Sequence, residues 1–211
     1  PIFYFKMKLA ALFSGGKDST YAIFLAKKLG HTVDVLLTLY PHSNESHLLH
    51  HPNINFTSLQ SESMKIPQLT GKIQSNKPKN EFETLNDLII CAKERYSIEG
   101  IVHGGILSNY QKENFSEACK NNQLEIHSPL WKKEPESYMK ELLYENFEYI
   151  ISTVSSDGLN NSWLGQTINK TNLNELQKLH KKFNFNLNFE GGEAETFVTN
   201  CPLFEKPILI L

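Results

Sequence analysis

A glycine pair set between a short apolar run and a patterned helix constrains this chain more than any other feature. Residues 9–13 are apolar, and they are followed directly by Ser14-Gly15-Gly16-Lys17-Asp18-Ser19-Thr20. From residue 22 to residue 29, apolar side chains recur at i, i+3, i+4 and i+7, a period that predicts a helix. The stretch therefore predicts a strand, a tight turn and a helix in immediate succession.

Such a corner suits an anion, because the first backbone N–H groups of the helix and its positive end meet at the turn. Gly15 and Gly16 let the backbone approach phosphate oxygens without a Cβ clash. Lys17 adds a positive charge. Further hydrogen-bond donors are the hydroxyls of Ser14, Ser19 and Thr20. The glycine spacing differs from that of the Walker loop, and the alternative interpretation is an ordinary strand–turn–helix corner.

Length and composition exclude several classes of protein. A chain of 211 residues can bury one large core or two small ones. Its formal net charge of −2 argues against a general nucleic-acid binder. Three distant cysteines offer neither a metal site nor a redox pair and fit a reduced, cytoplasmic setting. No apolar run approaches the roughly 18 residues that span a bilayer, so no membrane association is expected. Residues 1–6 precede Met7 and are interpreted as an upstream extension.

Apolar runs and helical periods alternate along the first part of the chain. Strands are expected over 33–40, from Ile66 and over 98–106, with helices over 53–64, over 82–96 and from residue 108. Residues 70–79 are polar and predict a loop, either a flap over a ligand or a solvated connection. Four strands alternating with helices predict a doubly wound α/β domain with a parallel sheet, assigned to residues 7–125.

The alternation then breaks, and residues 126–211 are interpreted as a smaller α+β domain packed on the carboxyl edge of the first. The expected elements are a helix opened by Pro135, a strand over 148–154, a helix over 172–183, and strands over 195–199 and 208–211.

Four histidines within ten residues, His42, His47, His50 and His51, raise the question of a zinc site. Their spacing matches no usual zinc-ligand pattern, and no set of cysteines or carboxylates accompanies them. They follow the carboxyl end of an expected strand, where open α/β sheets bind ligands. This position favours contact with a ligand over a metal site.

A second unusual stretch carries three carboxylates, Glu190, Glu193 and Glu195, around the glycine pair Gly191-Gly192. Carboxylates this close repel one another unless a cation or hydrogen-bond donors lie between them. One interpretation is a solvent-exposed acidic turn. The other is a site for a cation, such as ammonium, Mg²⁺ or a methylated amine.

Together these stretches resemble the diphthine–ammonia ligase family of N-type ATP pyrophosphatases. The resemblance runs from about residue 8 to about residue 204. The matching motifs are, in order, Ser14–Ser19, His51-Pro52-Asn53, Gly104 with Ser108 and Tyr110-Gln111, Pro129-Leu130-Trp131, Leu164-Gly165, and Glu190-Gly191-Gly192-Glu193 with Glu195-Thr196. Many ATP-using enzymes share the first motif, whereas the Tyr-Gln, Pro-Leu-Trp and Glu-Gly-Gly-Glu motifs narrow the resemblance to this family.

The resemblance implies a fold of the adenine-nucleotide α-hydrolase type and the last step of diphthamide synthesis on translation elongation factor 2. In that family, ATP and ammonium convert the diphthine carboxylate to an amide, and AMP and pyrophosphate are released. The implied cofactors are ATP and Mg²⁺, and the implied partners are ammonium and the diphthine-bearing factor. Neither a membrane nor a nucleic acid is implied, and a homo-oligomer is compatible with the family.

The resemblance also assigns roles to individual residues. The implied catalytic residues are Lys17, Asp18, Glu190, Glu193 and Glu195. The implied ATP-binding residues are Ser14, Gly15, Gly16, Lys17, Asp18, Ser19, Thr20, His51 and Gly104, with Asp18 also placing magnesium. The implied acceptor-binding residues are Ser108, Tyr110, Gln111, Trp131, Gly191, Gly192 and Thr196, although Trp131 also fits a core position.

Four positions depart from the family pattern. Ala194 stands where the family usually has tyrosine, and Asn109, Asn114 and Asn169 replace charged residues. These departures bear on acceptor contacts rather than on the phosphate loop, so two alternatives stay open. One is a tRNA-modifying adenylating enzyme, a class that shares the loop but generally adds a basic RNA-binding domain. The other is a module that binds ATP or AMP without turnover.

Overall fold

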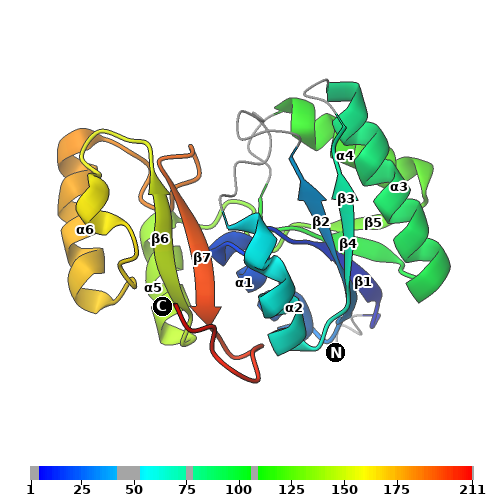
Figure 1. Ribbon diagram of the computed structural model, residues 1–211, viewed down its shortest axis with the longest axis horizontal. Coiled ribbons are helices and arrows are strands. Elements are labelled where there is room, and N and C mark those ends of the chain that lie inside the picture. Colours follow the sequence, from blue (N-terminus) through cyan, green and yellow to red (C-terminus); the bar gives the residue numbers. More distant parts are fainter. Residues whose placement is uncertain (1–4, 42–52, 75–77, 106–108, 211) are drawn as a thin grey trace.

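The computed structural model describes residues 5–41, 53–74, 78–105 and 109–210, apart from the side chains of residues 78, 109–112 and 114. Within them, a five-stranded parallel sheet and a two-stranded antiparallel sheet lie side by side (Figure 1). The larger sheet has the order β3-β2-β1-β4-β5. Its strands are β1 (Lys8–Leu12), β2 (Thr32–Tyr40), β3 (Gln68–Lys72), β4 (Gly100–Val102) and β5 (Glu125–His127).

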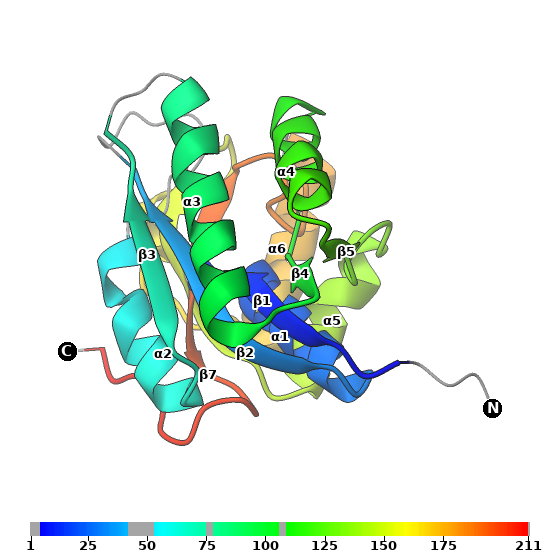
Figure 2. The ribbon, with the colours of Figure 1, turned by 90° about the vertical axis from the view of Figure 1, so that its right-hand side faces the viewer.

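Helices cover both faces of the larger sheet, which confirms the doubly wound arrangement. One face carries α1 (Lys17–Lys28) and α2 (Thr57–Met64), the latter preceded by a 3₁₀ turn, η1 (Ile54–Phe56). The other carries α3 (Pro78–Tyr96) and α4 (Asn109–Asn121), which lie next to each other in Figure 2. Alternate residues of β1 enter the two cores, Leu9 and Ala11 on one side and Ala10 on the other. No helix of the described residues is long and apolar enough to cross a membrane.

The direction of winding reverses between β1 and β4. The chain moves from β1 outward to β2 and β3, and then returns to add β4 and β5 on the other side. Loops leaving the carboxyl ends of β1 and β4 therefore diverge, and a crevice forms between them. Ser14–Ser19 follows β1 and His103–Gly105 follows β4, so both segments border this crevice.

The second unit packs on α1. It comprises α5 (Pro135–Tyr144), β6 (Glu148–Val154), a 3₁₀ turn η2 (Asn161–Trp163), α6 (Lys170–Phe183) and β7 (Ala194–Asn200). Pro135 opens α5 as predicted, and the Glu134 carboxylate caps it by accepting hydrogen bonds from two first-turn N–H groups. Tyr21 of α1 belongs to the core of this unit, with its ring 5.0 Å from that of Phe147. This packing fixes the second unit beside the phosphate loop.

Some of the predicted elements need correction. The strand β5 was not predicted, because its three residues Glu-Ile-His carry no apolar alternation. Residues 208–210 form no strand, and Ile208 only donates one backbone hydrogen bond of 2.7 Å to Thr199. The predicted loop over 70–79 is shorter, since β3 extends to Lys72 and α3 begins at Pro78. The helical periods predicted over 53–64 and 172–183 place Leu59 and Phe183 on the inward faces of their helices, but both residues are exposed.

Candidate functional site

A cavity of about 550 Å³ opens at the reversal point of the larger sheet and is closed on its far side by the second unit. Segments from both units line it, including parts of 14–19, 103–105 and 188–196. The glycine loop (residues 14–19) and the acidic turn (residues 190–195), which are distant in the sequence, therefore face the same cavity.

The first turn of α1 presents its N-terminus to this cavity. Its N-cap residue, Gly16, has no side chain that could accept from the first turn, and the Lys17 N–H donates to the Thr196 hydroxyl instead. The hydroxyls of Ser14 and Ser19 lie 3.2 Å apart at the cavity wall. The other N–H groups of the first turn, two hydroxyls and a positive helix end together make an anion site. The Thr20 hydroxyl instead bonds back to the Gly16 carbonyl at 2.8 Å and lies within the helix.

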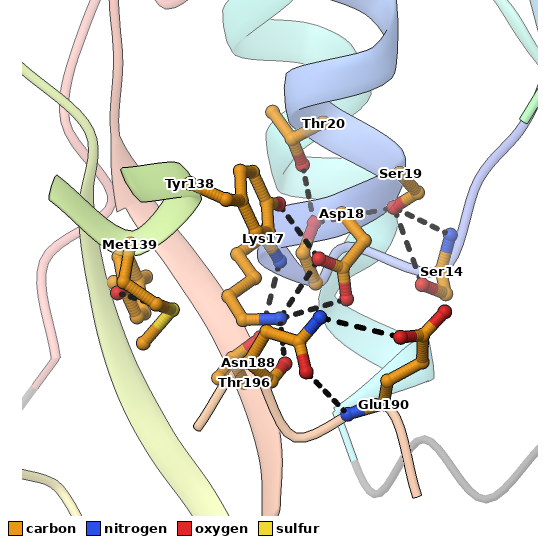
Figure 3. A network of polar contacts seen from close by, with 12 residues as sticks. Ser14, Lys17, Asp18, Ser19, Thr20, Tyr138, Met139, Asn188, Glu190 and Thr196 are labelled. Carbon is orange, nitrogen blue, oxygen red and sulfur yellow. Dashed lines mark hydrogen bonds and ion pairs between the residues drawn. The ribbon is translucent and has the colours of Figure 1, made fainter. Parts of the chain in front are cut away.

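Lys17 is the most completely buried charge of the site, with 2% of its side chain exposed. Its Nζ lies 2.8 Å from each carboxylate oxygen of Asp18 and 2.6 Å from the backbone carbonyl of Asn188 (Figure 3). The rings of Tyr138 and Phe189 flank it, with centroids at 5.6 and 5.8 Å. Three acceptors match the three N–H donors of the ammonium, so in this conformation Lys17 holds the acidic turn against the loop.

Asp18 faces the cavity, and 45% of its side chain is exposed. Its Oδ1 accepts a hydrogen bond of 2.6 Å from the hydroxyl of Tyr138. Burial, followed by the charge of Asp18, raises the pKa of Tyr138 well above its ordinary value, so the phenol remains a donor. A partly exposed carboxylate beside an anion site is a suitable ligand for Mg²⁺, which one or two carboxylates and substrate phosphates commonly hold.

Strand β7 fixes the glycine loop by direct hydrogen bonds. The Lys17 N–H donates to Thr196 Oγ1 at 3.1 Å, and the Val198 N–H donates to the Gly15 carbonyl at 3.0 Å. The amide of Gln60 donates to the carbonyls of Gly15 and Val198, at 3.0 and 2.7 Å. Gly15 itself does not line the cavity, because these contacts hold its carbonyl inside the protein.

Gly104 brings β4 against the helix N-terminus. A Cβ at this position would lie 2.3 Å from the carbonyl carbon of Asp18 and 2.5 Å from the nitrogen of Ser19. Only glycine allows this approach, which keeps the segment after β4 within reach of a ligand at the α1 N-terminus.

The three glutamates of the acidic turn have different surroundings. Glu190 and Glu195 line the cavity. Glu193 points to the opposite side, where its carboxylate accepts hydrogen bonds from both nitrogens of Asn186 and from the Gly191 N–H, at 2.6 to 2.9 Å. Donors, rather than a cation, therefore relieve the repulsion at Glu193, and Gly191 lines a separate polar cavity on that side.

Apolar side chains from β1, β2, α3 and α4 also line the cavity. Among them are Leu12, Leu37, Leu39, Phe82, Leu85 and Phe115. His103 packs edge-on against Phe115 and hydrogen-bonds the Ser128 hydroxyl. Burial lowers the pKa of His103 to about 4, so the ring is neutral at physiological pH.

Several predicted site residues lie outside what the structure describes. His51 and Ser108 are not described, and neither are the side chains of Tyr110 and Gln111. The other three histidines that were considered as zinc ligands, His42, His47 and His50, likewise lie outside the described residues. In the described part of the chain, no group of three or more His, Cys, Asp or Glu residues could hold a metal ion.

Trp131 lies at the cavity and is 62% exposed, so it is not a core residue. Gly192, with a φ of +82°, and Thr196 also line the cavity. Sequence reasoning missed Tyr138, Asn188 and His103. Asn188 and Phe189 directly precede the acidic motif, which was the one available signal, whereas nothing in the sequence connected Tyr138 to the glycine loop.

Comparison with known proteins gives consistent matches along the chain. The diphthamide synthase N-terminal domain family matches residues 7–126, and the diphthamide synthase C-terminal domain family matches residues 134–211. Proteins named diphthine–ammonia ligase from Rattus norvegicus and Homo sapiens are 33% and 32% identical, over 97% of this chain and 83% of each relative. A protein of the same name from Saccharomyces cerevisiae is 29% identical over 97% of this chain and 34% of its own length.

Proposed function

This chain belongs to the diphthamide synthase family, and on that basis we propose that it is a diphthine–ammonia ligase. The reaction would use ATP and ammonium to convert the diphthine carboxylate on translation elongation factor 2 to the amide of diphthamide. The observation that carries the proposal is that the anion site at α1 and the acidic turn line one cavity and are joined through Lys17. With elongation factor 2 as its partner the protein would act in the cytoplasm, and a homo-oligomer would be compatible with this activity.

The chemistry requires activation, because a carboxylate is a poor electrophile. In the proposed first step, an oxygen of the diphthine carboxylate attacks the α-phosphorus of ATP, and the bond to the bridging oxygen breaks to release pyrophosphate. Ammonia then attacks the acyl carbon, and AMP leaves with the bonding electrons. The ammonium nitrogen loses two protons along the way, one before attack and one as the amide forms, so a base near the acyl carbon is needed.

The residues of the glycine loop fit the phosphate half of this reaction. The N–H groups of the α1 first turn beyond Lys17 and the hydroxyls of Ser14 and Ser19 would hold the departing pyrophosphate. Asp18 would hold Mg²⁺, which would supply charge neutralisation for the phosphates. Gly104 would allow close approach of the nucleotide, and the apolar part of the cavity suits the adenine ring.

The residues of the acidic turn fit the nitrogen half. Glu190 and Glu195 would bind ammonium and accept its protons, because both carboxylates line the cavity. Glu193 would stabilise the conformation of the turn, since backbone and side-chain donors already occupy its carboxylate oxygens. Trp131, Gly192 and Thr196 would contact the acceptor side of the cavity.

The test is a measurement of AMP formation with each substrate omitted in turn. We expect AMP only when ATP, Mg²⁺, ammonium and diphthine-bearing elongation factor are all present, with the amide confirmed by mass spectrometry of the factor. AMP formation that ignores the factor would overturn the acceptor and favour another adenylated substrate, of which tRNA is the first to try. Tight ATP binding with no AMP under any condition would instead support a module without turnover.

A further inference from the structure

A tyrosine from the second unit contacts the carboxylate that we expect to hold magnesium. The hydroxyl of Tyr138, on α5, donates to Asp18 Oδ1 at 2.6 Å, across a sequence separation of 120 residues. Figure 3 shows the phenol lying above the Lys17–Asp18 pair, on the side away from Glu190. Tyr138 therefore reaches the glycine loop from a different unit of the fold.

This contact makes the two oxygens of Asp18 unequal. Oδ1 accepts from both Lys17 and Tyr138, whereas Oδ2 accepts, among the described residues, from Lys17 alone, at 2.8 Å. A carboxylate oxygen has two lone-pair sites. Oδ1 is therefore filled, and Oδ2 keeps one site on a side chain that is 45% exposed at the cavity.

Packing against neighbouring side chains holds the phenol ring of Tyr138 in place. The Tyr138 side chain is 3% exposed, and its ring centroid lies 5.7 Å from that of Tyr21. The Tyr21 hydroxyl in turn donates to Glu141 of α5 at 2.7 Å. Because the ring is fixed by packing, its hydroxyl cannot follow a large movement of Asp18, and the hydrogen bond limits how the carboxylate can turn.

We propose that Tyr138 is a positioning residue that orients Asp18, leaving Oδ2 directed at the cavity for the Mg²⁺ that accompanies ATP. Partners of this kind orient metal-binding carboxylates, and their removal typically lowers metal affinity about 10–100-fold. The inference rests on the proposed use of ATP and magnesium, and it is independent of the acceptor.

The experiment compares Tyr138→Phe with wild-type protein by electron paramagnetic resonance of Mn²⁺, in the presence of a saturating ATP analogue with a non-cleavable α,β bond. The variant keeps the ring and removes only the donor. We expect the dissociation constant of Mn²⁺ to rise about tenfold, while binding of the analogue without metal is unchanged. In turnover, the half-saturating Mg²⁺ concentration should rise, with the rate restored at high Mg²⁺.

Tyr149→Phe is the matched control, because it removes a buried hydroxyl in the same core that contacts Met139 Sδ rather than Asp18. Unchanged Mn²⁺ affinity in Tyr138→Phe, or an equal fall in Tyr149→Phe, would overturn the inference while leaving the proposed function intact. Failure of the wild-type protein to bind Mn²⁺ with the analogue would overturn both.

Discussion

The ammonium of Lys17 donates a hydrogen bond of 2.6 Å to the backbone carbonyl of Asn188, 171 residues further along the chain. The same ammonium spans both oxygens of Asp18. One buried side chain thus joins the loop suited to phosphate with the turn suited to ammonium. The alignment of the two halves of the proposed reaction depends on this cation, which makes it the first position to test.

Replacing Lys17 by methionine should destabilise the protein and abolish catalysis together. The variant leaves the Asn188 carbonyl and the Asp18 carboxylate without their shared donor, which costs about 2 kcal/mol once the partial exposure of Asp18 is allowed for. For a chain of this size that corresponds to a melting temperature lower by roughly 4–8 °C. AMP formation should fall at least about 100-fold, because the acidic turn loses its register with the loop.

Two further variants serve as comparisons for the measurements on Lys17→Met. Lys17→Arg should not restore activity, because a planar guanidinium does not fit three acceptors arranged around a compact ammonium. Lys28→Met removes an exposed partner of Glu145 and should leave melting temperature and AMP formation nearly unchanged. Wild-type activity in Lys17→Met would contradict the joining role.

Gly104→Ala should damage nucleotide binding through a backbone clash. The added Cβ would lie within 2.5 Å of the backbone of Asp18 and Ser19, so the first turn of α1 must move. We expect the affinity for an ATP analogue, measured by calorimetry, to fall at least about tenfold. Gly105→Ala is the comparison, because its Cβ meets no atom of the described residues within 4 Å and only its φ of +155° is unfavourable, at about 1 kcal/mol. Equal affinity in the two variants would mean that the close approach does not matter.

Local features of this fold could be predicted from the sequence. The anion loop follows from a glycine pair between an apolar strand and a patterned helix, and the boundaries of β6 matched the predicted strand over 148–154. These features depend on neighbours within a few residues, where periodicity and capping carry the information. The resemblance added the expectation that the loop and the acidic turn act together, and both line the cavity.

The contacts that define the site could not be predicted in the same way. The position of Lys17 on α1 does not reveal that its ammonium points toward Asn188, and no pattern links Tyr138 to Asp18. Both contacts arise from packing the second unit on α1. Likewise, the spacing of residues in the sequence gives no reason to assign different surroundings to Glu190 and Glu193. The turn at Gly192, with a φ of +82°, separates Glu190 on one cavity from Glu193 on another.

Substitutions that remove the charge of these two glutamates should therefore affect different properties of the protein. In Glu193→Gln, either orientation of the amide places an NH₂ group against a donor of Asn186 or Gly191, so the turn is destabilised. We expect a melting temperature lower by several degrees. Glu190→Gln should melt like the wild type but need at least about tenfold more ammonium for half-maximal AMP formation. A lower melting temperature in Glu190→Gln but not in Glu193→Gln would contradict the assignment of Glu193 to the turn and of Glu190 to ammonium.

The buried imidazole of His103 should make the fold less stable as the pH falls. Burial lowers its pKa in the folded protein to about 4, against 6.5 for an unperturbed histidine. Between these values the unfolded chain binds more protons than the folded one, so the free energy of unfolding decreases toward acid, by about 1.4 kcal/mol per pH unit for this group. His127, whose pKa is also lowered by burial and by nearby His31, adds to the same trend.

Urea unfolding of wild type and His103→Gln from pH 7.5 to 4.5 measures the contribution of His103 to this pH dependence. The variant should keep only the shallower slope of the remaining groups. If the two curves run parallel, His103 has the same pKa in the folded and unfolded protein, and burial does not keep the ring neutral.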